Sequence, residues 1–229
     1  MDSTSFDGIR PAASVIILRS ANEGFEVLLL KRNASLNFAA SQWVFPGGKI
    51  DPDDYPLQEG GTDHGREMEA AYKAAIRECR EEANITPANL AYFSTWTAPL
   101  RAKPRFRTHF FVATVGAEQE FEVDESEIVA GQWLALPEAA AMAASGELPM
   151  MPPTAVTLFE LSDNNHPDRL GLLLSERPYF DFAPKMVKVE HGAWLLYAGD
   201  SGWESGDISI DERRHRLFGH PDGRYSYFK

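Results

Sequence analysis

The stretch RECREEANI, residues 77–85, decides how this chain is interpreted. It lies at the end of residues 66–83, which lack Pro and Gly and therefore predict one continuous helix. Three glutamates follow one another at helical separations: Glu78, Glu81 and Glu82. Such separations bring the carboxylates together, which is mildly destabilising unless a cation lies among them. The stretch is therefore either a solvated helix face with ion pairs to Arg77 and Arg80, or a carboxylate cluster for a metal ion.

The other side of the same helix carries its apolar residues. Tyr72, Ile76, Cys79 and Ala83 are spaced by four, three and four residues. This spacing predicts one core-facing stripe. Cys79, the only cysteine, is interpreted as a small buried hydrophobic residue rather than as a nucleophile.

Composition limits the class of protein. The chain has 229 residues, of which 44% are hydrophobic, enough for one sizeable core. Its net charge of −12 argues against nucleic acid and against an anionic membrane surface as partners. A single cysteine excludes an intrachain disulfide, and the sequence shows no signal-like start and no long apolar run. A cytoplasmic location is expected, and the oligomeric state is not readable.

Strands and helices alternate along the chain without a regular βαβ repeat. Strands are predicted at 13–20, 25–32, 43–46, 90–96, 108–115 and 131–136, with a hairpin turn at 21–24. Helices are predicted at 137–146 and 152–164, and hairpins at 186–199 and 214–228. Residues 52–66, rich in Pro, Gly and Asp, are predicted to be loop. We expect one domain over 1–229, with a core at about 10–162 and a β-rich extension at about 163–229.

Together with Gly48 and Glu69 earlier in the chain, the glutamate stretch resembles the sequence motif of the Nudix hydrolase family. The box of that family reads G-x5-E-x7-R-E-U-x-E-E-x-G-U, where U is a bulky apolar residue. The matching residues are Gly48, Glu69, Arg77, Glu78, Cys79, Glu81, Glu82 and Ile85, preceded by FPGG at 45–48. The resemblance implies an α/β/α sandwich with a mixed β-sheet, here followed by the C-terminal β-rich extension. A chance match at this many positions is improbable, which favours the metal cluster over the charged helix face.

The chain departs from the box in two places. The segment between Gly48 and Glu69 is longer than five residues because it contains the insertion 52–66, and surface loops tolerate insertion cheaply. Asn84 stands where the box has Gly. Asn tolerates the left-handed conformation that often follows a helix, so Asn84 is predicted to end the helix.

The resemblance also implies roles for these residues. A divalent ion, Mg²⁺ or Mn²⁺, is expected on Glu78, Glu81 and Glu82 with help from the Gly48 carbonyl, because hard cations prefer oxygen ligands. The implied reaction is hydrolysis of the pyrophosphate linkage in a nucleoside diphosphate derivative. Arg77 is expected to orient a glutamate, and Glu69 to support the same network.

The general base is less sharply indicated. In many Nudix enzymes a later loop supplies a further glutamate, and the candidates are Glu120, Glu122, Glu125 and Glu127. We choose Glu127, which lies nearest the strand at 131–136. Two alternatives stay open. In the first, all four glutamates are solvated loop carboxylates, and in the second, Glu81 itself is the base. The catalytic candidates are therefore Glu81, Glu82 and Glu127.

The substrate is indicated by softer signals. Residues 28–54, 104–113 and 148–161, with the interrupted box, resemble the Nudix branch similar to animal coenzyme A diphosphatases. That branch implies coenzyme A or acyl-coenzyme A as the substrate, with Arg105 and Arg107 in the basic loop 101–107 as candidate phosphate ligands.

Other interpretations remain. The loop 101–107 is alternatively only solvated, and the branch usually has an acidic residue at position 107. The basic run 213–216 is interpreted as a solvated or ion-paired strand end. NADH, nucleoside diphosphate sugars and dinucleoside polyphosphates are alternative substrates for the same carboxylates. A non-catalytic Nudix-fold nucleotide-binding or regulatory module is the alternative from another class.

Overall fold

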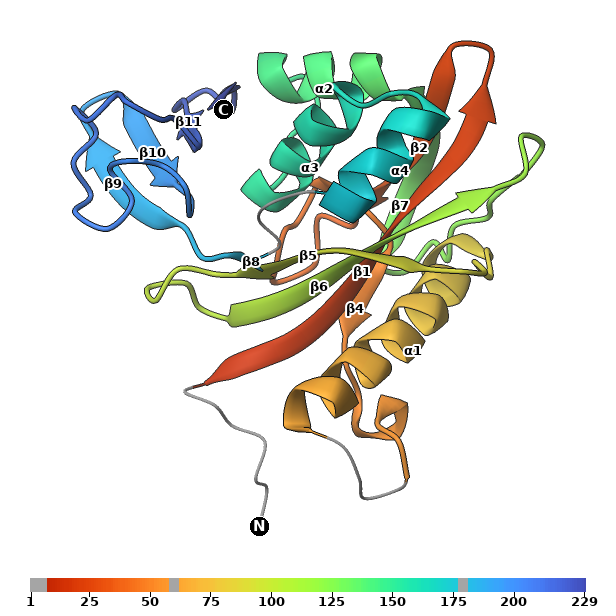
Figure 1. The fold of residues 1–229 in the computed structure, drawn as a ribbon. Coiled ribbons are helices and arrows are strands. Elements are labelled where there is room, and N and C mark those ends of the chain that lie inside the picture. Colours follow the sequence, from red (N-terminus) through yellow and green to blue (C-terminus); the bar gives the residue numbers. More distant parts are fainter. Residues whose placement is uncertain (1–7, 58–61, 177–180) are drawn as a thin grey trace.

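The computed structural model describes residues 8–57, 62–176 and 181–229 as two β-sheets and their covering helices (Figure 1). The strands are β1 (Ile9–Ala21), β2 (Gly24–Arg32), β3 (Trp43–Val44), β4 (Gly47–Lys49), β5 (Ala91–Thr97), β6 (Arg105–Val115), β7 (Ile128–Ala135), β8 (Asp181–Phe182), β9 (Lys185–Val189), β10 (Gly192–Leu196), β11 (Arg216–Gly219) and β12 (Tyr225–Phe228). The helices are α1 (Asp63–Ala83), α2 (Leu136–Ser145), α3 (Pro152–Ser162) and α4 (Pro167–Glu176), and a 3-10 turn, η1, covers Pro52–Asp54.

The central sheet is mixed, as the resemblance implied. Its order is β3-β2-β1-β6-β5-β8, with β4 also paired to β1 and β7 to β2. β1 runs parallel to β6 and β5 parallel to β8, and the other pairs are antiparallel. The predicted hairpin is β1–β2, and Gly24 supplies the positive φ, 89°, at the end of its turn.

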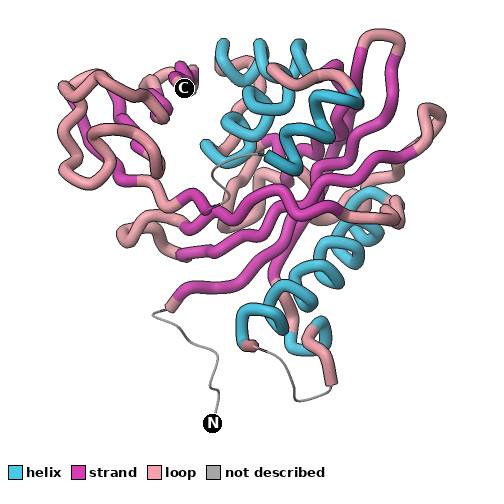
Figure 2. The backbone as a smooth tube through the Cα atoms, viewed as in Figure 1, coloured by secondary structure: helices cyan, strands magenta, loops and turns pink. Residues whose placement is uncertain are grey.

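Alternation along β1 divides the interior into two cores. Val15 and Ile17 belong to the hydrophobic cluster under α1, whereas Ile16 and Leu18 belong to the cluster under α2, α3 and α4. Successive strand residues point to opposite faces, so a strand buried on both sides is continuously apolar. Figure 2 shows the resulting layers, with helices on both sides of the strands.

The helix α1 lies against the sheet through small residues. Its buried apolar positions are Ala70, Ala71, Ala74, Ala75, Cys79 and Ala83. The prediction of a core stripe was right for Cys79 and Ala83 and wrong for Ile76, which is only half-buried and lines a cavity on the outer side of the helix. Alanines bring the helix axis close to the sheet, and the stripe is therefore centred on them rather than on the larger residues.

Two described parts of the insertion have regular structure. Residues 63–66, predicted as loop, form the first turn of α1, and the hydroxyl oxygen of Thr62 accepts a hydrogen bond from the Gly65 N–H at 3.1 Å. Pro52–Asp54 form η1. Residues 58–61 lie outside the described part of the chain.

The C-terminal extension contains the predicted β-structure and an unpredicted helix. The two hairpins form an antiparallel sheet of order β12-β11-β10-β9. The prediction was incomplete over 167–176, which form α4, and over Asp181–Phe182, which join the central sheet as β8. Leu170, Leu173 and Leu174 have helical spacing, a signal that places α4 on the core.

The extension packs on the same core as α2 and α3. Leu195, Tyr197 and Leu217 belong to the hydrophobic cluster on that side of the central sheet. The Trp96 and Phe182 rings stack with their centroids 4.2 Å apart. Tyr225 donates a hydrogen bond from its hydroxyl to the Met150 carbonyl at 3.0 Å. Figure 1 shows this sheet beside the α2–α3 layer.

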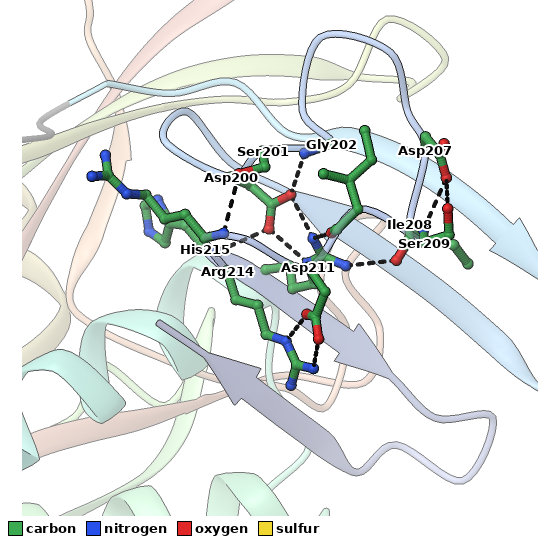
Figure 3. Close-up of polar contacts among 12 residues, drawn as sticks. Asp200, Ser201, Gly202, Asp207, Ile208, Ser209, Asp211, Arg214 and His215 are labelled. Carbon is green, nitrogen blue, oxygen red and sulfur yellow. Dashed lines mark hydrogen bonds and ion pairs between the residues drawn. The ribbon is translucent and has the colours of Figure 1, made fainter.

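A buried ion pair closes the long loop between β10 and β11. The Asp200 carboxylate accepts hydrogen bonds from Arg216 Nε at 2.6 Å and Nη2 at 2.8 Å. It also accepts from the backbone N–H groups of Gly202 and His215, so the loop folds around it (Figure 3). Arg216 in turn reaches the carbonyls of Ile208 and Ile210.

Among the described residues, no helix is both long and apolar enough to cross a bilayer.

Candidate active site

Two glycines bring the β4 backbone against the C-terminal half of α1. A Cβ at Gly47 would overlap the backbone of Ala13 and Ser14 on β1, and a Cβ at Gly48 would overlap the Glu78 carboxylate. The Gly47 N–H donates a hydrogen bond to Glu82 Oε2 at 2.8 Å. The glycines are therefore required by close approach, and they hold the helix carboxylates beside an extended backbone.

Glu82 is the most deeply buried of Glu78, Glu81 and Glu82, with 5% of its surface exposed. Burial is the main reason that its pKa rises to about 8, and the nearby charges of Glu78 and Glu127 add to the rise. The Gly47 N–H and the Arg32 guanidinium, 3.7 Å away, act in the opposite direction. The surrounding protein does not fully neutralise the negative charge of Glu82. A buried carboxylate whose charge is incompletely neutralised favours a bound cation.

Glu78 and Glu81 both face Arg77, but in different surroundings. Arg77 Nη1 donates to Glu78 Oε1 at 2.8 Å and lies 3.5 Å from Glu81 Oε2. Burial raises the pKa of Glu78 although Arg77 opposes this. Glu81 is exposed to solvent. The expected orienting role of Arg77 stays a prediction, and its contact with Glu78 has the geometry that this role needs.

Asp54 is a site residue that the sequence interpretation missed. Arg77 donates to both oxygens of its carboxylate, from Nε at 3.2 Å and from Nη2 at 2.9 Å. Burial would raise the pKa of Asp54, but hydrogen bonds from Arg77 and from the Asp51 N–H outweigh it, and the pKa lies below its usual value. The sequence did contain a signal for this turn, the run Asp51-Pro52-Asp53-Asp54. An Asp followed by Pro, with a second acidic residue three positions after the first, is typical of a capped helical turn.

Glu127 and Glu82 share Arg32 as a neighbour. The Glu127 carboxylate is 3.5 Å from Arg32 Nη2, and the same guanidinium approaches Glu82. Asp124 accepts backbone N–H groups from Ser126, Glu127 and Ile128, which fixes the loop entering β7. Of the four loop candidates, Glu127 contributes to the raised pKa of both Glu78 and Glu82. Glu122 instead accepts from the Asn84 side chain at 3.1 Å.

Three other predicted site residues have different neighbours. Glu69 is paired with Lys73 at 3.0 Å on the exposed side of α1. Arg105 donates from Nε to the Ala98 carbonyl at 3.0 Å, and Arg107 lies 3.7 Å from the Glu67 carboxylate. Within the described residues, these contacts are separate from those of Glu78 and Glu82, and their functional roles stay predictions.

The carboxylates suit a hard cation by chemistry, although their present arrangement is not a finished ligand set. In the described ranges, no three His, Cys, Asp or Glu side chains are arranged as one metal site. Arg77 holds Glu78, and the Gly47 N–H holds Glu82. Oxygen donors with incompletely compensated charge fit Mg²⁺ or Mn²⁺.

A cavity of about 640 Å³ runs along the outer side of α1, lined by Lys73, Ile76, Arg77, Arg80, Glu81, Asn84 and Thr86.

Comparison with solved structures shows the fold. A NUDIX hydrolase from Alicyclobacillus acidocaldarius superposes with a TM-score of 0.62 at 22% identity, covering 75% of this chain and 97% of that one. The NUDIX domain of Shewanella oneidensis NrtR, solved with ADP ribose, gives 0.53 at 16% identity, covering 71% and 92%. Both confirm the α/β sandwich with a mixed sheet.

Sequence comparison shows the family. A Caenorhabditis elegans protein with the name "Putative nudix hydrolase 7" is 27% identical in an alignment of 180 positions, which covers 67% of this chain and 60% of that relative. The match therefore spans under two thirds of the relative's length. The family described as NUDIX domain matches residues 8–153, which include every box residue and Glu127. These matches support the predicted enzyme class, a Nudix hydrolase, and this chain belongs to the NUDIX domain family.

Proposed function

We propose that the protein is a divalent-metal-dependent hydrolase that cleaves the pyrophosphate linkage of a nucleoside diphosphate derivative. The observation that carries the proposal is the buried Glu82, held by the Gly47 N–H next to Glu78, with its pKa raised to about 8. A protein gains nothing in stability from a buried carboxylate such as Glu82 beside the half-buried carboxylate of Glu78. Their arrangement is explained if a cation and a phosphate group complete the site.

The proposed ion is Mg²⁺ or Mn²⁺, with Glu78, Glu81, Glu82 and the Gly48 carbonyl as its protein ligands. When bound, such an ion polarises the phosphoryl group, neutralises its charge and lowers the pKa of a bound water. Arg77 keeps Glu78 in place at 2.8 Å. This ion would also allow a chain of charge −12 to accept an anionic substrate.

Glu127 is the proposed general base, with Glu81 as the alternative. A base must be charged and able to reach the attacking water, and the Glu127 side chain is 60% exposed beside Arg32. Arg32 approaches both Glu127 and Glu82, so it holds the base near the buried carboxylate. Glu127 would take the proton that the water loses as its oxygen attacks phosphorus.

The proposed substrate is coenzyme A or an acyl derivative, with hydrolysis yielding 3′,5′-ADP and a phosphopantetheine. Arg105 and Arg107 at the start of β6 are the proposed ligands of the 3′-phosphate, since both side chains are only half-buried. The substitution Arg105→Gln should raise KM for coenzyme A and leave KM for dephospho-coenzyme A unchanged. An equal effect on both compounds would remove Arg105 from the 3′-phosphate site.

The experiment that tests the function is a substrate panel. Coenzyme A, acetyl-coenzyme A, NADH, ADP-ribose, a nucleoside diphosphate sugar and a dinucleoside polyphosphate would each be incubated with enzyme and Mg²⁺ or Mn²⁺. Chromatography of both products identifies the bond that breaks. We expect cleavage of coenzyme A; cleavage of NADH with coenzyme A intact would refute the preferred substrate but not the reaction class.

A non-catalytic module is distinguished in the same panel. It would bind a nucleotide in calorimetry without producing cleavage products. Glu82→Gln should abolish turnover and keep the fold, while Glu138→Gln, the same change on the exposed first turn of α2, should leave turnover at the wild-type rate. A cytoplasmic location belongs to the proposal, in keeping with the one cysteine, which is buried and free.

A further inference from the structure

The loop before β7 is attached to the end of β2 at Glu127. Asn33 directly follows β2, and its backbone N–H donates to the Glu127 carbonyl at 2.8 Å. Its side-chain Nδ2 donates to the carbonyl of the preceding residue, Ser126, at 3.0 Å. We propose that Asn33 and Asp124 are positioning residues that hold the backbone of Glu127, the proposed general base. This inference rests on the proposed function, and it explains what keeps the Glu127 carboxylate beside Arg32.

Asp124 holds Glu127 from within the loop. Its Oδ2 accepts the Glu127 N–H at 2.9 Å and the Ser126 N–H at 3.2 Å, and its Oδ1 accepts the Ile128 N–H at 2.8 Å. With Asn33 on the carbonyl and Asp124 on the N–H, both backbone polar groups of Glu127 have partners. The carboxylate is therefore carried by a fixed backbone, although 60% of the Glu127 side chain is exposed.

The same loop contains a backbone conformation that is costly for its residue. Glu125 has a φ of 59°, in the left-handed region that few residues other than Gly adopt. It lies between Asp124 and the three N–H groups that the Asp124 carboxylate accepts. Strained residues persist only where their surroundings hold them, and they gather at functional sites. The turn is therefore a held conformation rather than a plain solvated loop.

A β-bulge directs the start of β7. The pairing of β2 with β7 shifts between Lys31 and Arg32, where β7 has one extra residue. Leu134 and Ile128 are an even number of residues apart and would share one face of a regular strand. Because of the bulge, Leu134 packs in the core under α2, α3 and α4, whereas Ile128 packs in the core under α1. The fully buried Ile128 thus anchors the chain directly after Glu127, under the helix that carries the box glutamates.

The test compares turnover in loop variants with and without the Glu127 carboxylate, using Mn²⁺ and the compound of the panel that the wild type cleaves fastest. Asn33→Ala should lower kcat by about tenfold to a hundredfold, because a catalytic group that is slightly misplaced loses rate. KM and the affinity for Mn²⁺ alone should stay near the wild-type values. In the Glu127→Gln background the same change should add little further loss, since two changes that act through one group are not additive. A merely structural role would lower kcat equally in both backgrounds.

Ser35→Ala is the matched control. Ser35 is exposed on the segment after β2, and its hydroxyl donates to Asn33 Oδ1 at 3.0 Å. Removing that hydroxyl leaves both contacts of Asn33 with the Glu127 loop in place, so kcat should stay at the wild-type value. Thermal melting shows that each variant is folded at the assay temperature.

Asp124→Asn is the second variant. The amide keeps the shape of the side chain but replaces one accepting oxygen with an N–H donor, so at least one of the loop contacts is lost. It should show the pattern expected of Asn33→Ala: a lower kcat by itself and little further loss on top of Glu127→Gln.

The outcomes separate the inference from the proposed function. Equal losses of kcat in the two backgrounds would overturn the inference, and wild-type kcat in Asp124→Asn would overturn it even if Asn33→Ala did not fold. If Glu127→Gln loses kcat and both loop variants keep it, the inference alone fails. If the wild type cleaves no compound of the panel, or if Glu127→Gln keeps the wild-type kcat, the proposed function fails as a whole or at its base, and the inference fails with it.

Discussion

At the scale of single residues, the fold places Glu82 where its charge is costly. Its carboxylate is buried and receives one backbone N–H, while the nearest cation, Arg32, lies 3.7 Å away and also approaches Glu127. Burial without full pairing favours the protonated form, which is why its pKa rises to about 8. The stability of the folded protein should therefore depend on pH and on a bound cation through the charge of Glu82.

Glu82 predicts how the stability of the metal-free protein changes with pH. The pKa of Glu82 is about 8 in the folded protein, against the ordinary 4.5 when unfolded, so its stabilising contribution is complete below about pH 4.5 and is lost as pH rises toward 8. Glu82→Gln stays neutral and keeps an acceptor for Gly47. Thermal melting without metal should therefore show similar midpoints near pH 5 and a higher midpoint for Glu82→Gln near pH 8.

The effect of metal provides the control for that experiment. Mn²⁺ at pH 8 should raise the melting midpoint of the wild type and leave that of Glu82→Gln nearly unchanged, because an ion that binds only the folded state stabilises it. A wild type that melts below the variant equally at pH 5 and at pH 8 would contradict the assignment of the titrating group.

The general base is tested at Glu127. Glu127→Gln cannot accept a proton, so kcat should fall by about 10²- to 10⁴-fold with Mn²⁺ affinity little changed. Steady-state kinetics measures kcat, and a Mn²⁺ titration measures the affinity. Glu118→Gln, in the same acidic loop but exposed, is the control. A comparable loss in Glu81→Gln, with Glu127→Gln fully active, would transfer the role to Glu81.

At the scale of elements, α1 determines where the carboxylates lie. Its alanine face sets the distance of the helix from the sheet, and Asn84 ends it in the left-handed conformation with φ 53°. The Asn84 N–H donates to the Arg80 carbonyl and the Ile85 N–H reaches the Cys79 carbonyl, the pattern of a left-handed helix end. The predicted helix stop is thereby confirmed, and Asn fills the position that the box gives to Gly.

The cost of that conformation can be measured at Asn84. Asn84→Gly and Asn84→Ala both remove the hydrogen bond to Glu122, so the difference between them isolates the backbone term. Glycine adopts positive φ freely, whereas alanine is strained there by roughly 1 kcal/mol. Urea unfolding should rank the glycine variant above the alanine variant by about that amount; equal stabilities would mean that the helix end relaxes in solution.

At the scale of the whole molecule, the extension packs on the core under α2, α3 and α4, whereas α1 lies over the other core of the central sheet. Tyr197 and Phe182 contact Trp96 on β5, and the α2–α3 layer meets β12 through Tyr225. Asp200 and Arg216 form a buried pair that organises the loop within the extension. We therefore expect damage at this pair to lower the stability of the whole chain in a single transition.

This expectation is tested with Asp200→Asn. Removing one partner leaves the Arg216 charge buried, which typically costs about 3–5 kcal/mol. Burial would raise the pKa of Asp200, but Arg216 and two backbone N–H groups lower it, so the pair contributes stability above the unfolded pKa and loses it as pH falls. Urea unfolding at pH 7 should show one transition at a clearly lower midpoint.

The control for that variant is Asp222→Asn, which removes an exposed pair with Arg224 and should keep the wild-type midpoint. Two separate transitions in Asp200→Asn, with only one of them shifted, would instead mean that the extension unfolds independently of the core.

Local patterns were sufficient for much of this protein. The spacing of Glu78, Glu81 and Glu82 on one helix, the β1–β2 hairpin and the end of α1 at Asn84 all depend on residues close in sequence, where helical period and turn conformation are decisive. The same holds for the two C-terminal hairpins. The family followed from such a local motif, because its residues lie mostly within one helix.

Contacts between distant segments could not be obtained in that way. The Asp54–Arg77 contact, the Arg32 guanidinium between Glu82 and Glu127, and the alanine face of α1 all depend on how the insertion, the β7 loop and the sheet meet around one helix. Glu69 matches the box by spacing, yet the fold pairs it with Lys73 and gives Arg77 a carboxylate from the insertion. Side-chain periodicity specifies the face of an element, whereas burial and the approach of distant backbone decide which charges meet on it.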